Sequence, residues 1–177
     1  RLSSGLRING AADDAAGNAV AVKMKSQILG TNMSIRNSAD ATGMVQTAES
    51  GMNTVSNIVL RMREISVQMN NGIYSAADRA NASSEFNALR NEITKIATYT
   101  AFNGVSLLSG GVDTTIRAGD TNTQTIAVTI DSILPTALSI SSITLATLAN
   151  AASSVTALDG ALSALAGFQA ELGALQN

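Results

Sequence analysis

Two adjacent carboxylates, Asp13 and Asp14, are the residues whose types could most directly carry out chemistry. Paired carboxylates can act as general acid and general base, or they can hold a metal ion. Either role needs further partners, such as a nearby base or a cluster of ligands, and the sequence offers none. The pair stands directly before a long alanine-rich segment, where acidic residues complement the unpaired N–H groups of a helix start. We therefore interpret both residues as helix-starting acids.

The string "AGD" at 118–120 could belong to a phosphate-binding loop, but it lacks the lysine and the following helix that such a loop needs. A hairpin turn is the better interpretation. The chain has no Cys and no His, which removes thiol nucleophiles, disulfides and imidazole bases, and leaves zinc only carboxylate ligands. The methionines recur at helical spacing and are interpreted as core residues. We expect no enzymatic activity, no cofactor and no metal site.

A third group of residues, Arg61, Arg63 and Glu64, could bind a partner through its charges. From the residues alone, a solvated helix face explains such a group more readily than a binding site does. Both interpretations stay open at this point.

Composition narrows the function classes further. The formal net charge is −2 and no basic stretch contains interleaved aromatics, so nucleic-acid binding is not expected. No run of about 18 apolar residues occurs, so we expect neither a transmembrane helix nor a membrane partner. Apolar residues make up 45% of the chain and aromatics only 3%, which favours thin packings of helices. Because the chain begins at Arg1, without Met, in sequence that looks like the middle of a longer chain, we expect a trimmed fragment.

The strongest structural pattern predicts one long helix from about 15 to 71, after a polar loop over 1–14. Apolar residues in it recur at alternating steps of three and four, the spacing of a seam between helices that pack at shallow angles. Ile58 and Ile65 form a second row beside this seam, so we expect two neighbouring helices. Internal glycines each cost about 1 kcal/mol relative to Ala, so lateral contacts must support the helix. The seam consists of Met44, Ala48, Met52, Val55, Val59, Met62, Ser66 and Met69.

Three further elements complete a single domain over 1–177. Ser75 and Asp78 form a capping-box pattern before a helix expected at about 76–100. Residues 105–135 are expected to be a β-hairpin region, because 112–131 alternates with a period of two. An amphipathic helix is expected over 153–177, and 136–152 stay ambiguous. The fold class is therefore mainly α, an elongated antiparallel helical bundle or coiled coil of long helices with a small β-hairpin.

Several long strings resemble bacterial flagellin, in order along the chain. They are "RLSSGLRINGAADDAAG" (1–17), "QTAESGMNTVSNIVLRMREISVQMNNG" (46–72), "TAFNGVSLLSG" (100–110), "IRAGDTNTQTI" (116–126) and "ALDGALSALAGFQAELGALQN" (157–177). Matches of this length are specific, unlike a single short motif.

The resemblance implies a structural subunit of the bacterial flagellar filament, secreted through the flagellar type III export channel and assembled outside the cell with other flagellin subunits for motility. In the family, terminal D0 helices form an inner tube, and D1 shell domains of long helices with a β-hairpin surround it. The sequence resembles a D1 shell domain alone, without the D0 helices or outer variable domains. Such a fragment is not expected to polymerise by itself.

The resemblance also implies a surface for partners. The shell domain of the family is seen by the animal innate receptor TLR5, whose motif LQRVRELAVQ falls on 59–68 here. Leu60 and Ile65 depart from that motif, and Leu89 stands where the next helix of receptor-active flagellins has Arg, which argues against strong receptor activation. Filament contacts use much of the same face. The implied contact residues for subunits or receptor are Arg61, Arg63, Glu64, Ile65, Gln68 and Glu85.

Two function classes are therefore considered. The first is a filament subunit, which we favour. The second is a binding module: a flagellin-like cell-surface protein, a hook–filament junction protein or a ligand of TLR5. A junction protein should lack the full arrangement from "QTAE" to "TAFNG" that this chain retains.

Overall fold

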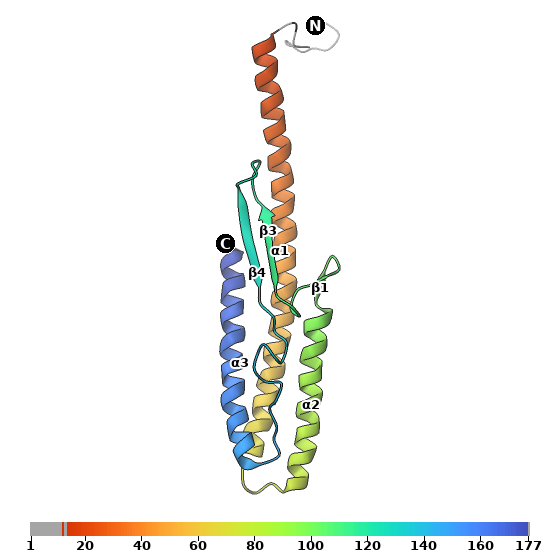
Figure 1. The fold of residues 1–177 in the computed structure, drawn as a ribbon, viewed down its shortest axis with the longest axis vertical. Helices are drawn as coiled ribbons and strands as arrows, with labels where there is room; N and C mark the ends of the chain where they lie inside the picture. Colours follow the sequence, from red (N-terminus) through yellow and green to blue (C-terminus); the bar gives the residue numbers. More distant parts are fainter. Residues whose placement is uncertain (1–11, 13, 177) are drawn as a thin grey trace. The chain divides into compact units, whose positions relative to one another are not determined.

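The computed structural model describes residue 12 and residues 14–176, and it confirms the mainly α fold class (Figure 1). Three helices are present in this part of the chain: α1 (Ala15–Met69), α2 (Ala76–Tyr99) and α3 (Leu148–Leu175). Two antiparallel β1–β2 and β3–β4 pairs accompany them, with β1 at Ala101–Phe102, β2 at Val105–Ser106, β3 at Val112–Arg117 and β4 at Thr125–Ile130. The loop expected over 1–14 lies almost entirely outside the described residues.

Contacts divide the chain into two compact units. Unit 1 contains the described part of 1–41 together with 115–127, and unit 2 contains 42–114 together with the described part of 128–177. The interpretation of the whole chain as one domain stays a prediction.

In unit 1, α1 is accompanied by the tip of the β3–β4 hairpin. Asp14 accepts a hydrogen bond from the backbone N–H of Gly17 at 3.0 Å, as expected for a helix-starting acid, while Asp13 lies outside the described residues. Gly30 lets the hairpin come close, because a Cβ there would lie 3.0 Å from Cβ of Asp120. Nearby, the Asn37 side chain donates to the carbonyl of Arg117 at 3.3 Å.

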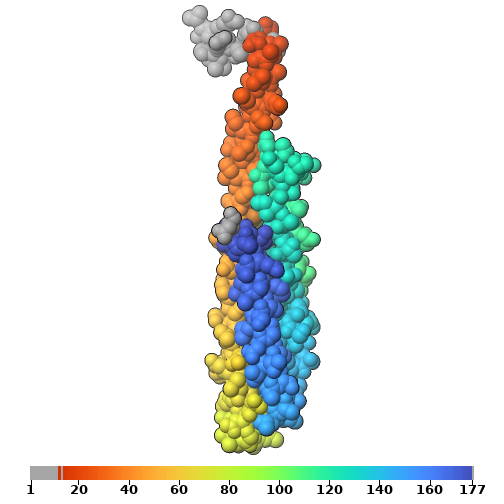
Figure 2. Space-filling view, turned by 90° about the vertical axis from the view of Figure 1, so that its left-hand side faces the viewer, coloured from red at the N-terminus to blue at the C-terminus, as the bar shows by residue number. Residues whose placement is uncertain are grey.

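Unit 2 contains the core seam of α1, which lies between α2 and α3 in Figure 1, and Figure 2 shows α3 alongside α1. Seven of the eight expected seam residues are buried, and Val45 is buried in place of the half-buried Met44. Polar pairs between α1 and α3 run in opposite directions along the two helices: Arg63 with Asp159, Asn53 with Gln169, and Glu49 with Gln176. The helices are therefore antiparallel, and the expectation of two neighbours is confirmed.

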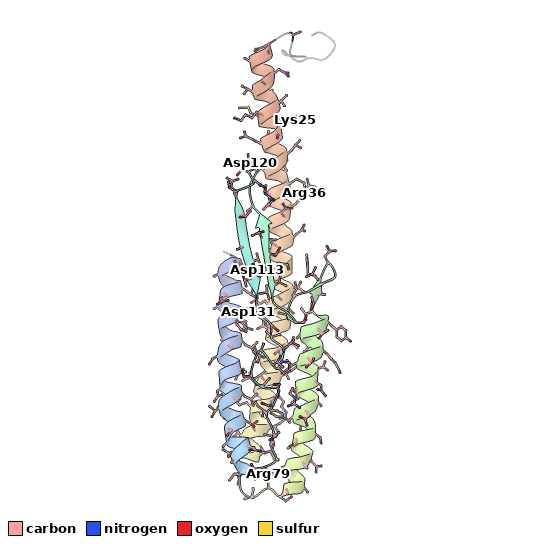
Figure 3. All side chains as sticks on the ribbon, in the orientation of Figure 1. Lys25, Arg36, Arg79, Asp113, Asp120 and Asp131 are labelled. Atoms are coloured by element: carbon pink, nitrogen blue, oxygen red, sulfur yellow. The ribbon has the colours of Figure 1, made fainter. Side chains whose placement is uncertain are left out.

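The turn between α1 and α2 is fixed by an arginine that belongs to none of the patterns predicted from the sequence. Arg79 is 7% exposed, and its guanidinium donates to the carbonyls of Met69 and, at 2.9 Å, Asn71 (labelled in Figure 3). These bonds satisfy carbonyl groups at the end of α1, which stops at Met69 rather than at Asn71. The capping box at the start of α2 is confirmed, because the Ser75 and Asp78 side chains each bond to the other residue's backbone N–H.

Short β segments after α2 pack against glycines of α1. Asn103 and Gly104 both have positive φ (49° and 78°), which closes the two-residue turn between β1 and β2. The sequence predicted this turn but not the strands around it. A Cβ on Gly51 would lie only 2.7 Å from the side chain of Leu108, so glycine is needed there for close approach.

The ambiguous segment 136–152 contains the start of α3 and most of an irregular segment, residues 131–147, which is called here the strap. Thr147 caps this helix by accepting from the backbone N–H of Asn150 at 3.2 Å, so α3 begins five residues before the expected position 153. Buried apolar residues hold the strap: Ile133, Leu138, Ile140 and Leu145.

By length and composition alone, α3 could cross a membrane, although the sequence has no run of about 18 apolar residues. The core helix of a soluble protein can pass the same test. The buried residues of α3 recur at heptad spacing along one side of the helix. The apolar character comes largely from Ala and Leu, interrupted by Asp159 and Glu171.

Candidate interaction surface

Arg61 pairs with two carboxylates, and the one from Glu85 connects α1 to α2. Its guanidinium lies 3.0 Å from Glu64 on the same helix and 2.9 Å from Glu85 on α2. The hydrogen bonds that the Arg61 guanidinium donates to the carboxylates of Glu64 and Glu85, in that order of effect, raise the pKa of Arg61. About half of each of the Arg61 and Glu85 side chains stays accessible to solvent (52% and 50%), so the pair can meet a partner as well as each other.

Arg63 connects α1 to α3 instead. Its Nε donates to Asp159 Oδ1 at 2.6 Å and its Nη2 to Oδ2 at 3.4 Å, which is a forked ion pair. The hydrogen bond from Arg63 lowers the pKa of the Asp159 carboxyl. Residues two apart on a helix point about 200° apart around its axis, so Arg61 and Arg63 face different neighbours.

The remaining expected contact residues divide between the core and the surface. Ile65 is 2% exposed and belongs to the core of unit 2, so it offers a partner no side-chain surface in this conformation. Its position in the second apolar row predicts this burial, and its inclusion among the contact residues stays a prediction that the burial does not favour. Gln68 is exposed and donates to the hydroxyl of Tyr74 at 3.1 Å. Leu89 is half-buried on α2.

Asp159, the partner of Arg63, is not among the contact residues predicted from the sequence. A signal for it exists, because Asp159 and Glu171 are the only charged residues in α3 and lie in an otherwise apolar and small-residue segment. Pairing it with Arg63 requires the register of α1 against α3, which the sequence does not reveal.

Grooves in unit 2 carry no reactive centre among the described residues. A groove of about 410 Å³ lies between α2 and the strap, where Arg90 donates to the carbonyls of Ser141 and Ile143. A wider one of about 620 Å³ lies between α1 and the end of α2, lined mainly by small and polar residues such as Gly43, Thr47 and Ser50. In the part of the chain that the structure describes, no three His, Cys, Asp or Glu residues gather as metal ligands would.

The fold and the surface define a class of protein: a bundle of long antiparallel helices with β-hairpins, whose charged groups connect one helix to another. Comparison with known proteins shows which family of this class the chain belongs to. A family model described as the bacterial flagellin N-terminal helical region matches residues 1–113. The chain belongs to the bacterial flagellin family, a family of structural proteins, as the resemblance predicted.

Individual relatives agree with this assignment. The chain is similar to a flagellin of Halalkalibacterium halodurans, with 40% identity over 182 residues, and the match covers 100% of this chain and 66% of the relative. The crystal structure of Bacillus cereus flagellin matches with a TM-score of 0.70 and 30% identity, over 80% of this chain and 83% of that one. A structure described as a flagellar hook-associated protein from Vibrio parahaemolyticus matches with a TM-score of 0.76 over 95% and 90% of the two chains. Its 15% identity shows a shared fold alone.

Proposed function

We propose that this chain is part of a subunit of the bacterial flagellar filament, where it assembles with copies of itself outside the cell. The observation that carries the proposal is the match to the H. halodurans flagellin, which extends over the whole chain at 40% identity. The chain spans 66% of the length of that relative, so the assembly of the entire protein is inferred from the family. Export through the flagellar type III channel is part of the same proposal.

The geometry supports a structural role. In unit 2 the titratable side chains with shifted pKa values are engaged in helix-connecting ion pairs or in the capping box, as the bonds of Arg61, Arg63 and Asp78 show. We propose no catalytic activity and no cofactor. The exposed halves of Arg61, Glu64 and Glu85 are available to a neighbouring subunit, and we propose them as subunit contacts together with Arg63 and Gln68.

A chimeric filament tests this proposal. The chain would replace the matching part of the H. halodurans flagellin, and the chimera would be produced in a bacterium whose own flagellin gene is deleted. Electron microscopy should show filaments on the cell surface, and swimming should return. A chimera that is secreted and folded but forms no filaments would overturn the proposal.

The junction-protein alternative is less well supported than the filament subunit. The hook-associated structure shares the fold at 15% identity, whereas the flagellin match extends over the whole chain at 40%. Binding of TLR5 and a role as a cell-surface binding protein stay predictions of the resemblance, and no contact among the described residues favours either.

A further inference from the structure

The groove of about 410 Å³ between α2 and the strap has the size of a small-molecule site. Phe86, Asn87 and Arg90 line it from α2, and residues 141–146 line it from the strap. The strap runs between two helices at this point, because residues 142–144 also line a hollow against α3 (Figure 1). All of these residues belong to unit 2, so the groove lies within one compact unit.

Arg90 is the only charged residue among the described residues that line the groove. Its Nη1 donates to the carbonyls of Ser141 at 2.7 Å and Ile143 at 3.3 Å, and its Nη2 donates to Asn87 Oδ1 at 2.8 Å. These bonds use three of the five N–H donors of a guanidinium, which leaves two, including the one on Nε, without a partner in the described chain. The groove therefore favours an anion.

The strap brings further donors to the same groove. The N–H groups of Thr144, Leu145 and Ala146 donate to no backbone carbonyl among the residues that the structure describes. Leu145 is 0% exposed, and buried backbone N–H groups are nearly always paired. An acceptor from outside the chain is therefore expected beside this part of the strap. A carboxylate meets that need, because its two oxygens only accept.

The groove also has apolar walls. Phe86 on α2 is 1% exposed, and Ile143 on the strap is half-buried. A bare inorganic anion would use the donors but leave these apolar walls in contact with water. A ligand with an anionic end and an apolar body uses both, which is the usual combination in small-molecule sites.

We propose that this groove binds small organic acids, with the carboxylate on the two remaining N–H donors of Arg90 and the apolar body against Phe86 and Ile143. A planar carboxylate can accept two N–H bonds from one guanidinium, which fixes its orientation. The bound acid connects α2 to the strap, so it should also stabilise the fold in proportion to its occupancy. This site goes beyond the proposed function, because it needs unit 2 alone and does not depend on filament assembly.

Benzoate is a suitable probe, and benzamide is its matched control because it has the same ring without the charge. Each would be titrated into the ¹⁵N-labelled chain and followed by amide NMR spectra. Benzoate should cause saturating shifts at 144–146 and at the Nε–H of Arg90, and benzamide should bind about tenfold more weakly or less. Equal binding of the two compounds, or benzoate shifts that do not saturate or that lie elsewhere in the chain, would overturn the proposal.

Two variants test the two halves of the groove. Arg90→Gln should weaken benzoate binding by about tenfold, the effect of losing a charged hydrogen-bond donor. Because Arg90 also holds the strap, Ala146→Phe provides a second variant that fills the groove and keeps the guanidinium; Ala146 is exposed, so the fold should be retained. It should weaken benzoate by a similar factor.

The control for both variants is Lys95→Gln, which removes an exposed positive charge from the same helix outside the groove. It should leave benzoate binding unchanged. An Ala146→Phe chain that binds benzoate as the parent chain does would show that the acid lies elsewhere. Weakening of the same size in Lys95→Gln would show that benzoate responds only to the net charge of the helix.

Inorganic phosphate separates an organic-acid site from a site for any anion. At constant ionic strength, an equal concentration of phosphate should not displace benzoate, because phosphate has no apolar body to place against Phe86. Displacement of benzoate by phosphate would overturn the assignment to organic acids.

Discussion

Gly51 and Gly167 are both interior helix glycines, yet their surroundings give opposite expectations for a change to alanine. In a helix, Gly→Ala gains up to about 1 kcal/mol when space is available. Gly167 has that space, so Gly167→Ala should stabilise the fold by about 0.5–1 kcal/mol in urea unfolding followed by circular dichroism.

Gly51→Ala should instead destabilise the fold by about 1–3 kcal/mol, because the new Cβ would lie 2.7 Å from Leu108 and 3.0 Å from the Thr100 hydroxyl. The pair of variants is its own control, since both remove a glycine from a helix. A stabilising Gly51→Ala would show that the segment after α2 does not pack on α1 as described.

The Arg63–Asp159 pair predicts a pH dependence. The pKa of Asp159 is lowered by its hydrogen bond from Arg63, so the folded chain binds this proton more weakly than the unfolded chain. The stabilisation is therefore present above the ordinary pKa of 3.8 and is lost as pH falls through the lower folded value. Asp159→Asn should be less stable than the parent chain at pH 7, and this difference should close towards pH 2.

The control for that prediction is the same change in an Arg63→Gln background. Without the guanidinium, Asp159→Asn should alter the free energy of unfolding much less at pH 7. A pH-independent difference between parent and Asp159→Asn would contradict the ion pair as the cause.

At the level of elements, the turn between α1 and α2 depends on Arg79. Arg79→Leu removes the donors to the carbonyls of Met69 and Asn71 and should cost about 1–3 kcal/mol, the range for buried groups left unpaired. Chemical denaturation measures this loss. Arg90→Leu is a matched comparison, because Arg90 also donates to two carbonyls but is half-buried rather than buried. An Arg79→Leu chain as stable as the parent would remove the capping role.

The elements differ in how far sequence could predict them. The seam of α1 repeats every three or four residues, so both its burial and its two neighbours follow from spacing. The strap has no such period, because Ile133, Leu138, Ile140 and Leu145 are held by irregular backbone rather than by a repeating face. Several Ser and Thr residues precede α3, and sequence does not indicate that Thr147 is the one that caps it. Tertiary contacts determine both the path of the strap and the residue at which α3 begins.

For the molecule as a whole, the family was predictable because long strings match along the chain, whereas the contact residues stay a prediction. The six expected contact residues were chosen as one group. In the structure, Arg61 pairs with a residue of α2, Arg63 pairs with a residue of α3, and Ile65 lies in the core.

If Arg61 and Glu85 contact a neighbouring subunit, their loss should lower the stability of the filament more than the stability of the folded chain. Each side chain is about half exposed, so its loss should disturb the monomer little, whereas a filament repeats the loss at every subunit. In the chimera, Arg61→Ala or Glu85→Ala should lower the temperature at which filaments dissociate by more than it lowers monomer melting. Lys95→Ala is the control, because Lys95 forms an exposed pair with Glu92 on α2 and is not a proposed contact. If monomer melting falls as far as filament dissociation, or if the Lys95 variant behaves in the same way, these residues serve the fold and not the contact between subunits.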